Sequence, residues 1–388
     1  MLEGVNVALG VTGSIAAVKV VELAHELRRR GAEVRGVLTE SAQGIVHPWA
    51  VEFATDNEPI TDLTGGVEHV ELCGRDGWAD VLLIAPCTAN TVGKIAAAVD
   101  DSPVTTTATT AIGAGVPVVV APAMHEPMYD HPGVLDAIDR VESWGVGFVD
   151  PRIEEGKAKI ATEEAIVTEV ARATTPDSLA GEHVVVTAGA TSEPIDPIRT
   201  ITNRASGKTG RAIARGCYVR GADVTLVHDG EDVPYAHVRR AERAAEMRDA
   251  VLAAVDDGAD ALISAAAISD FTVDAADTKI KSGEARTLTL EPAPKLIDGV
   301  REAHPSLPIV GFKAETGADD EELVEKARGI LDRAGLSFVV ANDASVMGDD
   351  ETRVLLVRGE GYVAFTGSKA ELGALVAEQL SDVLVPAE

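Results

Sequence analysis

Short apolar runs recur along the chain, separated by longer segments in which apolar residues return every three or four positions. The short runs are typical of buried strands, and the periodic segments are typical of amphipathic helices. Strands that alternate with helices predict α/β folds with mostly parallel sheets. The expected strands are residues 6–11, 33–39, 81–85, 116–121, 183–187, 223–228, 262–266, 309–312 and 338–341.

A strand–helix–strand pattern occurs at two places in the chain, near the start and near the middle. Residues 6–39 read as a strand, a glycine turn, a helix over 14–30 and a second strand, and residues 183–228 repeat this order around a longer loop. Gly31 and Gly221 follow the two helices, where a glycine commonly ends a helix. The repeated opening indicates two separate sheets.

We therefore expect two doubly wound, Rossmann-like domains, residues 1–175 and 180–388, joined where the sequence TTPDS interrupts a helical pattern. A chain of 388 residues is too long for one ordinary core and suits two domains. Near the end, residues 354–367 alternate between apolar and polar side chains, which predicts a hairpin of antiparallel strands.

The most informative segment is residues 187–210, TAGATSEPIDPIRTITNRASGKTG. It is a long polar loop between an expected strand and an expected helix, which is where α/β proteins place ligands. The helix opens on Ser206, Gly207 and Lys208, so free backbone N–H groups and the positive end of the helix dipole face the loop. This arrangement predicts an anion site, most simply for phosphate.

A second candidate phosphate turn opens the first half, where VALGVTGSIA spans residues 7–16 and Ser14 is the expected N-cap. Its spacing, Gly10-x-x-Gly13-x-x-Ala16, differs from the G-x-G-x-x-G dinucleotide fingerprint. An NAD(P)-dependent oxidoreductase built on this turn is one alternative, although it leaves the second half unexplained.

Charge and composition narrow the function classes. The chain has 63 acidic and 34 basic side chains and a net charge of −29, which argues against general nucleic-acid binding. Dispersed acid with few lysines suits a high-salt cytosol, so we expect a halophile. Three widely spaced cysteines suit a reducing, cytoplasmic location, and neither a signal peptide nor a membrane span is expected.

Several motifs together resemble one known family. GVTGSIAA, PCTANTVGKIA and PAMHxxM are similar to flavin-dependent cysteine decarboxylases, and the segment 187–210 is similar to phosphopantothenate–cysteine ligases. In this order they resemble the bifunctional phosphopantothenoylcysteine decarboxylase/phosphopantothenate–cysteine ligases of coenzyme A synthesis. The resemblance covers nearly the whole chain.

For the first half, the resemblance implies FMN and decarboxylation of 4′-phosphopantothenoylcysteine to 4′-phosphopantetheine. It makes His69 the catalytic histidine, which in the family reaches a flavin across a trimer contact, and it places Met124 and His125 at the substrate. Residues implied near the flavin are Gly13, Ser14, Thr39, Thr88, Thr105 and Thr106.

Two departures from the bacterial pattern stand out. His125 replaces the asparagine that binds the substrate carboxylate, and an imidazole can also donate a hydrogen bond. The flap region 152–162 lacks the family's proton-donating cysteine, for which Lys157, Lys159, Cys73 or Cys87 could substitute, although an inert buried cysteine is the simpler interpretation. A ligase with a non-catalytic or regulatory flavin-binding half therefore stays open as an alternative.

For the second half, the resemblance implies that 4′-phosphopantothenate is activated as an acyl-nucleotide and then joined to cysteine. It gives catalytic roles to Asn203 and Lys279 and places Ser206, Gly207 and Lys208 at the substrate. CTP with Mg²⁺ is the favoured co-substrate, and ATP stays open because the family's next lysine pair is not clearly reproduced. Trimers of the first half and dimers of the second would combine into a dodecamer. The implied nucleotide-binding residues are Asp270, Lys279, Pro294, Lys295, Leu296, Phe312 and Lys326.

Overall fold

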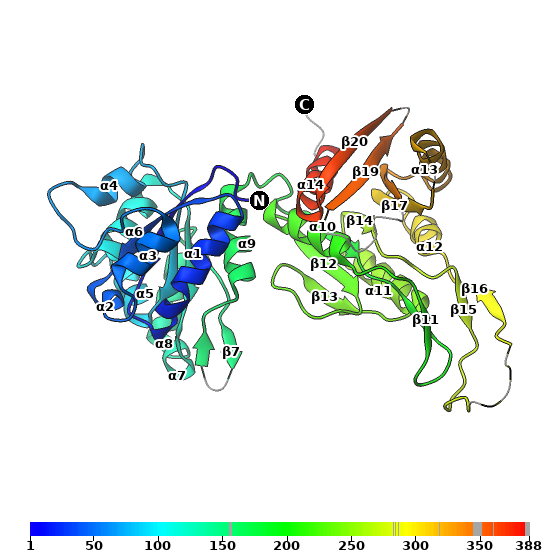
Figure 1. The fold of residues 1–388 in the computed structure, drawn as a ribbon, viewed down its shortest axis with the longest axis horizontal. Coiled ribbons are helices and arrows are strands. Elements are labelled where there is room, and N and C mark those ends of the chain that lie inside the picture. Colours follow the sequence, from blue (N-terminus) through cyan, green and yellow to red (C-terminus); the bar gives the residue numbers. More distant parts are fainter. Residues whose placement is uncertain are drawn as a thin grey trace. The chain divides into compact units, whose positions relative to one another are not determined.

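A computed structural model describes residues 1–154, 157–281, 283, 285, 287–317, 319–343, 351–359 and 361–384 (Figure 1). The chain divides into two compact units, Met1–Thr175 and Pro176–Glu388, which are described separately. Among the described residues, no helix combines the length and the apolar character needed to cross a membrane.

A five-stranded parallel sheet forms the centre of the first unit. The chain moves from the first strand outward to one edge and then returns to the other side, so the connections reverse direction between β1 and β3. The strand order is β2 (Glu33–Leu38), β1 (Asn6–Val11), β3 (Val81–Cys87), β4 (Val118–Pro122) and β6 (Gly147–Phe148).

Helices cover both faces of this sheet. Alternate strand residues such as Ala8, Leu82 and Val120 share a core with one group of helices, while Val7 and Leu9 are buried on the opposite face. Burial on both faces explains why these strands read as continuous apolar runs. The first group is α4 (Glu68–Cys73), α5 (Ala89–Ala96), α6 (Pro103–Ala114) and α8 (Pro132–Glu142). A second group that packs together is α1 (Val20–Arg29), α3 (Pro48–Thr55) and α9 (Glu163–Thr174).

Smaller elements complete the first unit. A three-stranded antiparallel sheet joins β5 (Met124–His125) to the hairpin of β7 (Arg152–Glu154) and β8 (Lys157–Lys159). The other short elements are a 3₁₀ helix (Ile15–Lys19), α2 (Glu40–Gln43) and α7 (Glu126–Tyr129).

The second unit contains an eight-stranded sheet whose first six strands are parallel. The last two strands form an antiparallel hairpin against the edge of the parallel part. The order is β13 (His237–Arg240), β12 (Asp223–His228), β9 (His183–Thr187), β14 (Ala261–Ser264), β17 (Ile309–Glu315), β18 (Phe338–Asp343), β19 (Glu351–Arg358) and β20 (Gly361–Ser368).

Two helix layers sandwich this sheet. One core contains α10 (Lys208–Val219) and α14 (Lys369–Leu384), which cross closely where Gly216 meets Gly373. An added Cβ at Gly216 would lie 2.4 Å from the carbonyl oxygen of Gly373, so this crossing requires glycine. The other core contains α11 (Ala244–Asp256), α12 (Leu296–Ala303) and α13 (Asp320–Ala334).

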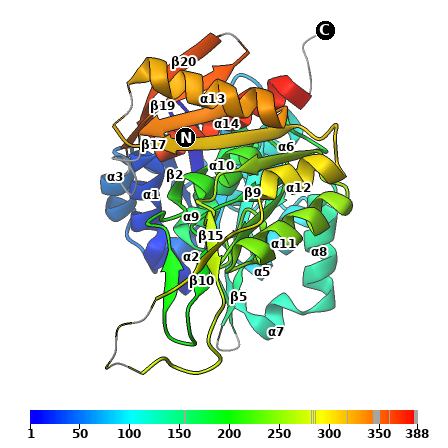
Figure 2. The same cartoon turned by 90° about the vertical axis from the view of Figure 1, so that its right-hand side faces the viewer.

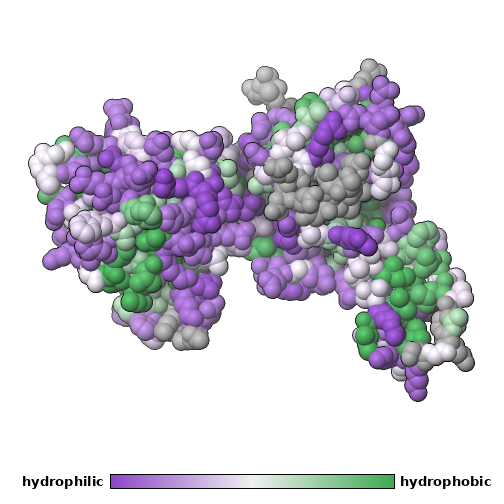
Figure 3. Space-filling model, viewed as in Figure 1, coloured by the Kyte–Doolittle hydropathy of each residue, from purple (hydrophilic) through white to green (hydrophobic). Residues whose placement is uncertain are grey.

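Two pairs of short strands project from the body of the second unit (Figure 2). β10 (Ser192–Pro194) pairs with β11 (Thr200–Thr202), and β15 (Phe271–Val273) pairs with β16 (Leu290–Pro292), both antiparallel. We call the described residues of 192–202 and 271–292 the arm. Apolar surface is visible over β15 and β16 in Figure 3, where Phe271, Leu288 and Leu290 are exposed.

The expected fold class is confirmed, since both units are α/β with mostly parallel, doubly wound sheets. The expected C-terminal hairpin is also confirmed as β19 and β20. The helix expected over 14–30 differs, because it begins as a 3₁₀ helix and becomes an α-helix only at Val20. The strands of the arm were not expected, because three residues are too few to show a period.

Candidate functional site

In the first unit, the loops after β1 and β3 lie together where the connections reverse direction, which is the usual ligand position in an open α/β sheet. The buried hydroxyl of Thr12 links them. It donates to the carbonyl oxygen of Pro86 at 2.8 Å and accepts from the N–H of Thr88 at 3.2 Å. These bonds hold the loop that contains Gly13 and Ser14 next to the loop that contains Thr88.

Most of the hydroxyls expected near the flavin already have local partners. Thr88 caps α5 by accepting from the N–H of Thr91, and Thr105 shares a capping box with Ser102 at the start of α6. Thr39 accepts from the N–H of Ala42 at 3.2 Å and begins α2. These residues build the helix starts that surround the site.

Close packing explains why Gly13 carries no side chain. A Cβ built at this position would lie 2.4 Å from Oγ and 2.6 Å from Cβ of Ser41. Contacts under 3.0 Å require one of the two segments to shift. The loop after β1 therefore lies directly on the start of α2, as a backbone cradle would.

His69 and Thr106 each have a buried polar atom without a hydrogen-bond partner among the described residues of the first unit. His69 is on α4, which packs against α6, the helix of Thr106. The Nδ1 atom of His69 and the Oγ1 atom of Thr106 are buried and have no hydrogen-bond partner among the described residues. Buried polar atoms are usually satisfied, so two such atoms beside a sheet switch point indicate a site shaped for a ligand. These features fit a flavin.

The structure brings His125 next to the expected flap region, a neighbourhood that the sequence did not indicate. Met124 pairs with Ala158 and His125 pairs with Lys157 across the β5–β8 ladder. Lys159 forms an ion pair with Glu154 at 3.0 Å, within the same hairpin. Residues 155 and 156 and the side chain of Lys157 lie outside the described part of the chain.

The two cysteines considered as replacements for the flap thiol are buried. Cys73 and Cys87 expose none of their surface. Burial raises the pKa of the Cys73 thiol to about 12 and raises the pKa of Cys87 further. A thiol in such surroundings stays protonated and behaves as a small apolar side chain.

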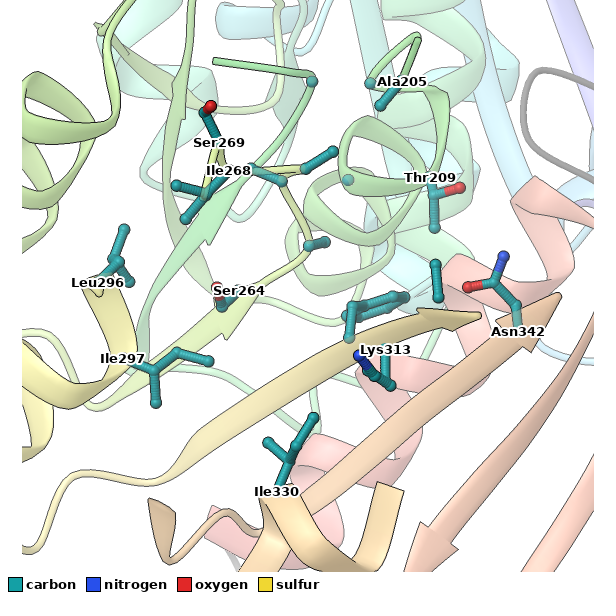
Figure 4. Close-up of a pocket in the computed structure, with 18 of the residues that line it drawn as sticks. Ala205, Thr209, Ser264, Ile268, Ser269, Leu296, Ile297, Lys313, Ile330 and Asn342 are labelled. Atoms are coloured by element: carbon teal, nitrogen blue, oxygen red, sulfur yellow. The ribbon is translucent and has the colours of Figure 1, made fainter. Parts of the chain in front are cut away.

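In the second unit, a cavity of about 390 Å³ lies at the carboxyl ends of β14, β17 and β18 (Figure 4). Thr209 and Asn342 line one end of it, and Leu296 and Ile297 line the other. The cavity thus has a polar end and an apolar end. It brings together eight of the residues expected from the sequence, namely Ser206, Gly207, Lys208, Asp270, Pro294, Lys295, Leu296 and Phe312.

The cavity lining is rich in cations although the chain is strongly acidic. Among the described residues, five cationic and two anionic side chains line it, in a protein with a net charge of −29. The start of α10, where Gly207 provides no side-chain cap, adds backbone N–H groups and the positive end of the helix dipole. The cations are Lys208, Lys295, Lys313, Arg333 and Lys369, and the anions are Asp270 and Asp298.

Salt bridges hold several of these cations in place. Lys295 pairs with Asp270 at 2.5 Å, and Arg333 pairs with Asp298 at 2.9 Å. Lys313 pairs with Glu315 at 2.7 Å, and hydrogen bonds from Lys313 and Lys326 lower the pKa of that carboxyl. Among the described residues, Lys326 does not line the cavity, and it is linked to the lining residue Lys313 through Glu315, with which both lysines pair.

Backbone bonds join the two loops at the switch point of the second sheet. Ala267 donates its N–H to the carbonyl oxygen of Gly189 at 2.8 Å, and Ser269 donates its N–H to Oγ1 of Thr191 at 2.8 Å. The side-chain amide of Asn203 donates to the carbonyl oxygen of Ala267 at 2.9 Å. Asn203 is therefore docked on the loop that lines the cavity, although it is not itself among the lining residues.

Lys279 is placed differently from the other expected residues. It is exposed, lies on the arm and does not line the cavity. Its neighbour Ile280 is bonded to the turn between β10 and β11 through Asp196 and Arg199. The second unit thus holds most of the expected nucleotide residues in its cavity and presents Lys279 from the arm.

Comparison with known proteins supports one family over both units. Residues 1–175 match a family model described as Flavoprotein, and residues 179–384 match one described as the C-terminal domain of the DNA/pantothenate metabolism flavoprotein. The coenzyme A biosynthesis bifunctional protein CoaBC of Thermococcus kodakarensis is 50% identical over 361 residues, covering 92% of this chain and 89% of the relative. This chain belongs to the CoaBC family.

Other CoaBC proteins match over a similar extent. That of Methanocaldococcus jannaschii is 34% identical and covers 99% of this chain and 95% of the relative. That of Bacillus subtilis is 35% identical and covers 90% of this chain and 88% of the relative. A family that accounts for both units removes the reason for the oxidoreductase alternative, which explained only the first.

Sequence reasoning missed part of the cavity wall in this CoaBC protein. Thr352 on β19 and Lys369 at the start of α14 both line the cavity and are buried. The scarcity of lysine in the chain is a signal that could have drawn attention to Lys369. Its place in the site was not predictable, because it depends on the packing of α14 against α10, a helix far earlier in the chain.

Proposed function

We propose that the protein catalyses two successive steps of coenzyme A synthesis. The second unit joins cysteine to 4′-phosphopantothenate at the expense of a nucleoside triphosphate, and the first unit decarboxylates the resulting 4′-phosphopantothenoylcysteine with FMN. Membership of the CoaBC family supports both activities. The observation that carries the proposal is the cavity of the second unit, which concentrates cations in an acidic chain.

The cavity suits a nucleoside triphosphate bound in one orientation. Its apolar end, with Leu296, Ile297 and Ile330, suits a base, and the start of α10 suits phosphate groups. We propose CTP as the nucleotide and Mg²⁺ held mainly by its phosphates. Within the described residues, no group of three or more His, Cys, Asp and Glu side chains is arranged to hold a metal.

The ligation proceeds in two steps. A carboxylate oxygen of 4′-phosphopantothenate attacks the α-phosphorus, and pyrophosphate leaves. The amine of cysteine then attacks the acyl carbon, an amide forms and the nucleoside monophosphate leaves. In this scheme Lys279 offsets the charge that develops at the α-phosphate, and Asn203 holds the acyl-nucleotide.

In the first unit, FMN would lie against the loops after β1 and β3. Gly13 gives it close access to the backbone, and Thr106 supplies a buried hydroxyl with no other partner among the described residues. When bound, the flavin supplies the oxidation and reduction that make loss of CO₂ possible. His69 orients the substrate and exchanges a proton at its imidazole, while His125 donates a hydrogen bond to the carboxylate.

We also propose that the protein is a cytoplasmic homo-oligomer that contains trimers of the first unit and can assemble further into a dodecamer. Trp49 and Phe53 on α3 expose 76% and 78% of their surface, which favours burial against another chain. The three cysteines are free, which suits a reducing compartment.

The division of labour is tested with two substitutions. His69→Asn should lower CO₂ release from 4′-phosphopantothenoylcysteine by about 100-fold or more and leave ligation intact. Lys279→Gln should do the reverse, because it removes a cation from the acyl-transfer site. CO₂ and pyrophosphate are measured separately, with His25→Asn and Lys281→Gln as controls. Loss of both activities in either folded variant would refute the assignment.

A further inference from the structure

The segment that carries Lys279 is attached to the turn of the neighbouring hairpin by three hydrogen bonds. Ala276 donates its N–H to the carbonyl oxygen of Ile195 at 2.9 Å, and Ile280 donates its N–H to Oδ2 of Asp196 at 3.0 Å. The guanidinium of Arg199 donates to the carbonyl oxygen of Ile280 at 3.1 Å. Ile280 is therefore held on both its N–H and its carbonyl.

Asp196 is the centre of this attachment. Its side chain is buried, and its two carboxylate oxygens accept hydrogen bonds from different groups. Oδ1 accepts the N–H groups of Ile198 and Arg199 at 2.8 and 2.9 Å, which fixes the turn. Oδ2 accepts from Ile280 and from the guanidinium of Arg199, which fixes the Lys279 segment against that turn.

The position of Lys279 depends on the hydrogen bond between Asp196 and Ile280, because few other hydrogen bonds among the described residues are available to hold its segment. The side chain of Lys279 is exposed, and its segment lies beyond the last paired residue of β15. A flexible exposed lysine contributes to catalysis only when its backbone is held, because misplacement of a catalytic group by about 1 Å can cost about 100-fold in rate.

We propose that Asp196 is a positioning residue of the ligase, which holds the backbone at Ile280 so that Lys279 reaches the reacting phosphate. This inference rests on the proposed role of Lys279. Asp196 touches neither substrate nor nucleotide in this account. Its action passes through the peptide at Ile280 and through the guanidinium of Arg199.

The Asp196→Asn substitution should remove the hydrogen bond to Ile280 and keep the bonds that form the turn. When the amide oxygen replaces Oδ1, the turn keeps its two backbone bonds, and the amide nitrogen then faces two donors, the N–H of Ile280 and the guanidinium of Arg199. A donor opposite two donors forms no hydrogen bond, so the link to Ile280 is lost while the size of the side chain is kept.

Glu193→Gln is the matched control, because Glu193 is another buried carboxylate of the same hairpin. It accepts the N–H of Ala244 and the hydroxyl of Thr272, each at 2.8 Å. A glutamine keeps the first bond with its oxygen and can donate to the hydroxyl in the second. Arg199→Lys is the second variant, since it keeps the backbone bonds of Asp196 and removes only the guanidinium bridge.

Two measurements on the full-length protein decide the matter. Hydrogen exchange of the peptide covering residues 276–281 should become faster in Asp196→Asn, to a lesser extent in Arg199→Lys, and not in Glu193→Gln. The kcat of ligation should fall by about 100-fold in Asp196→Asn and severalfold in Arg199→Lys, with the KM for nucleotide unchanged because the cavity is not altered. CO₂ release should be unaffected.

Other outcomes separate the possible failures. Unchanged exchange in Asp196→Asn would show that the attachment does not hold the segment. Faster exchange with a normal kcat, while Lys279→Gln is inactive, would show that Lys279 needs no such support, and either result overturns the inference. Ligation that survives Lys279→Gln would overturn the proposed role of Lys279 and this inference with it. If Asp196→Asn fails to fold, Arg199→Lys decides by the same criteria.

Discussion

Buried polar side chains in the two units differ strongly in the number of hydrogen bonds that they form. Asp196 accepts four hydrogen bonds, whereas buried atoms of His69 and Thr106 accept or donate none among the described residues. A carboxylate whose oxygens all accept hydrogen bonds stabilises the local backbone, whereas a buried polar atom without a partner in a concave site is available to bind a ligand. This contrast separates positioning residues from ligand-binding residues.

The bonds of Asp196 predict a pH dependence of stability. Burial acts to raise its pKa, but the backbone N–H groups of Ile198, Ile280 and Arg199 and the guanidinium outweigh it and lower the pKa to about 2. A lowered folded-state pKa stabilises the protein above the unfolded-state value of about 4, and this contribution disappears as the pH falls toward 2. The thermal midpoint of wild type should therefore exceed that of Asp196→Asn at neutral pH, and calorimetry should find the difference shrinking between pH 4 and pH 2. A constant difference over this range would contradict the origin of the lowered pKa.

At the scale of elements, the central strands were predictable and the arm was not. β1, β9 and β12 have the bounds expected from the sequence because their apolar runs are buried on both faces. The strands of the arm have three residues each, and only Glu193 and Val273 among these residues are buried, so neither length nor alternation marks them. The sequence motifs predicted the cavity-lining residues that lie within them. The position of Lys369 could not be predicted in this way, because it depends on packing between distant elements.

The contact between the loop after β1 and the start of α2 gives a second prediction. Gly13→Ala should destabilise the first unit by about 1–3 kcal/mol, because the new methyl group overlaps Ser41. Tryptophan fluorescence measures this effect, since Trp49, Trp78 and Trp144 all belong to the first unit.

A double variant tests the same contact in reverse. Adding Ser41→Gly removes the atoms that the alanine meets and should restore most of the lost stability and the bound flavin colour. Gly44→Ala is the control, since its nearest neighbour would be 3.5 Å away. Equal losses in Gly13→Ala with and without Ser41→Gly would show that the overlap is not the cause.

At the scale of the whole molecule, the net charge of −29 sets the response to salt. Repulsion between dispersed carboxylates destabilises the compact state, and salt screens it, with a Debye length of about 10 Å at 0.1 M and about 3 Å at 1 M. The thermal midpoint should therefore rise between 0.1 and 2 M KCl. A midpoint that stays constant or falls would remove the interpretation of the composition as an adaptation to high salt.

We propose that both units are active and work in sequence. The most direct measurement supplies the purified protein in high salt with 4′-phosphopantothenate, cysteine, Mg²⁺ and either CTP or ATP, and follows pyrophosphate and CO₂ separately. Both products are expected with CTP, in equal amounts once the 4′-phosphopantothenoylcysteine intermediate has been consumed. Pyrophosphate without CO₂ would contradict it, because the first unit would then be a flavin-binding scaffold rather than a decarboxylase.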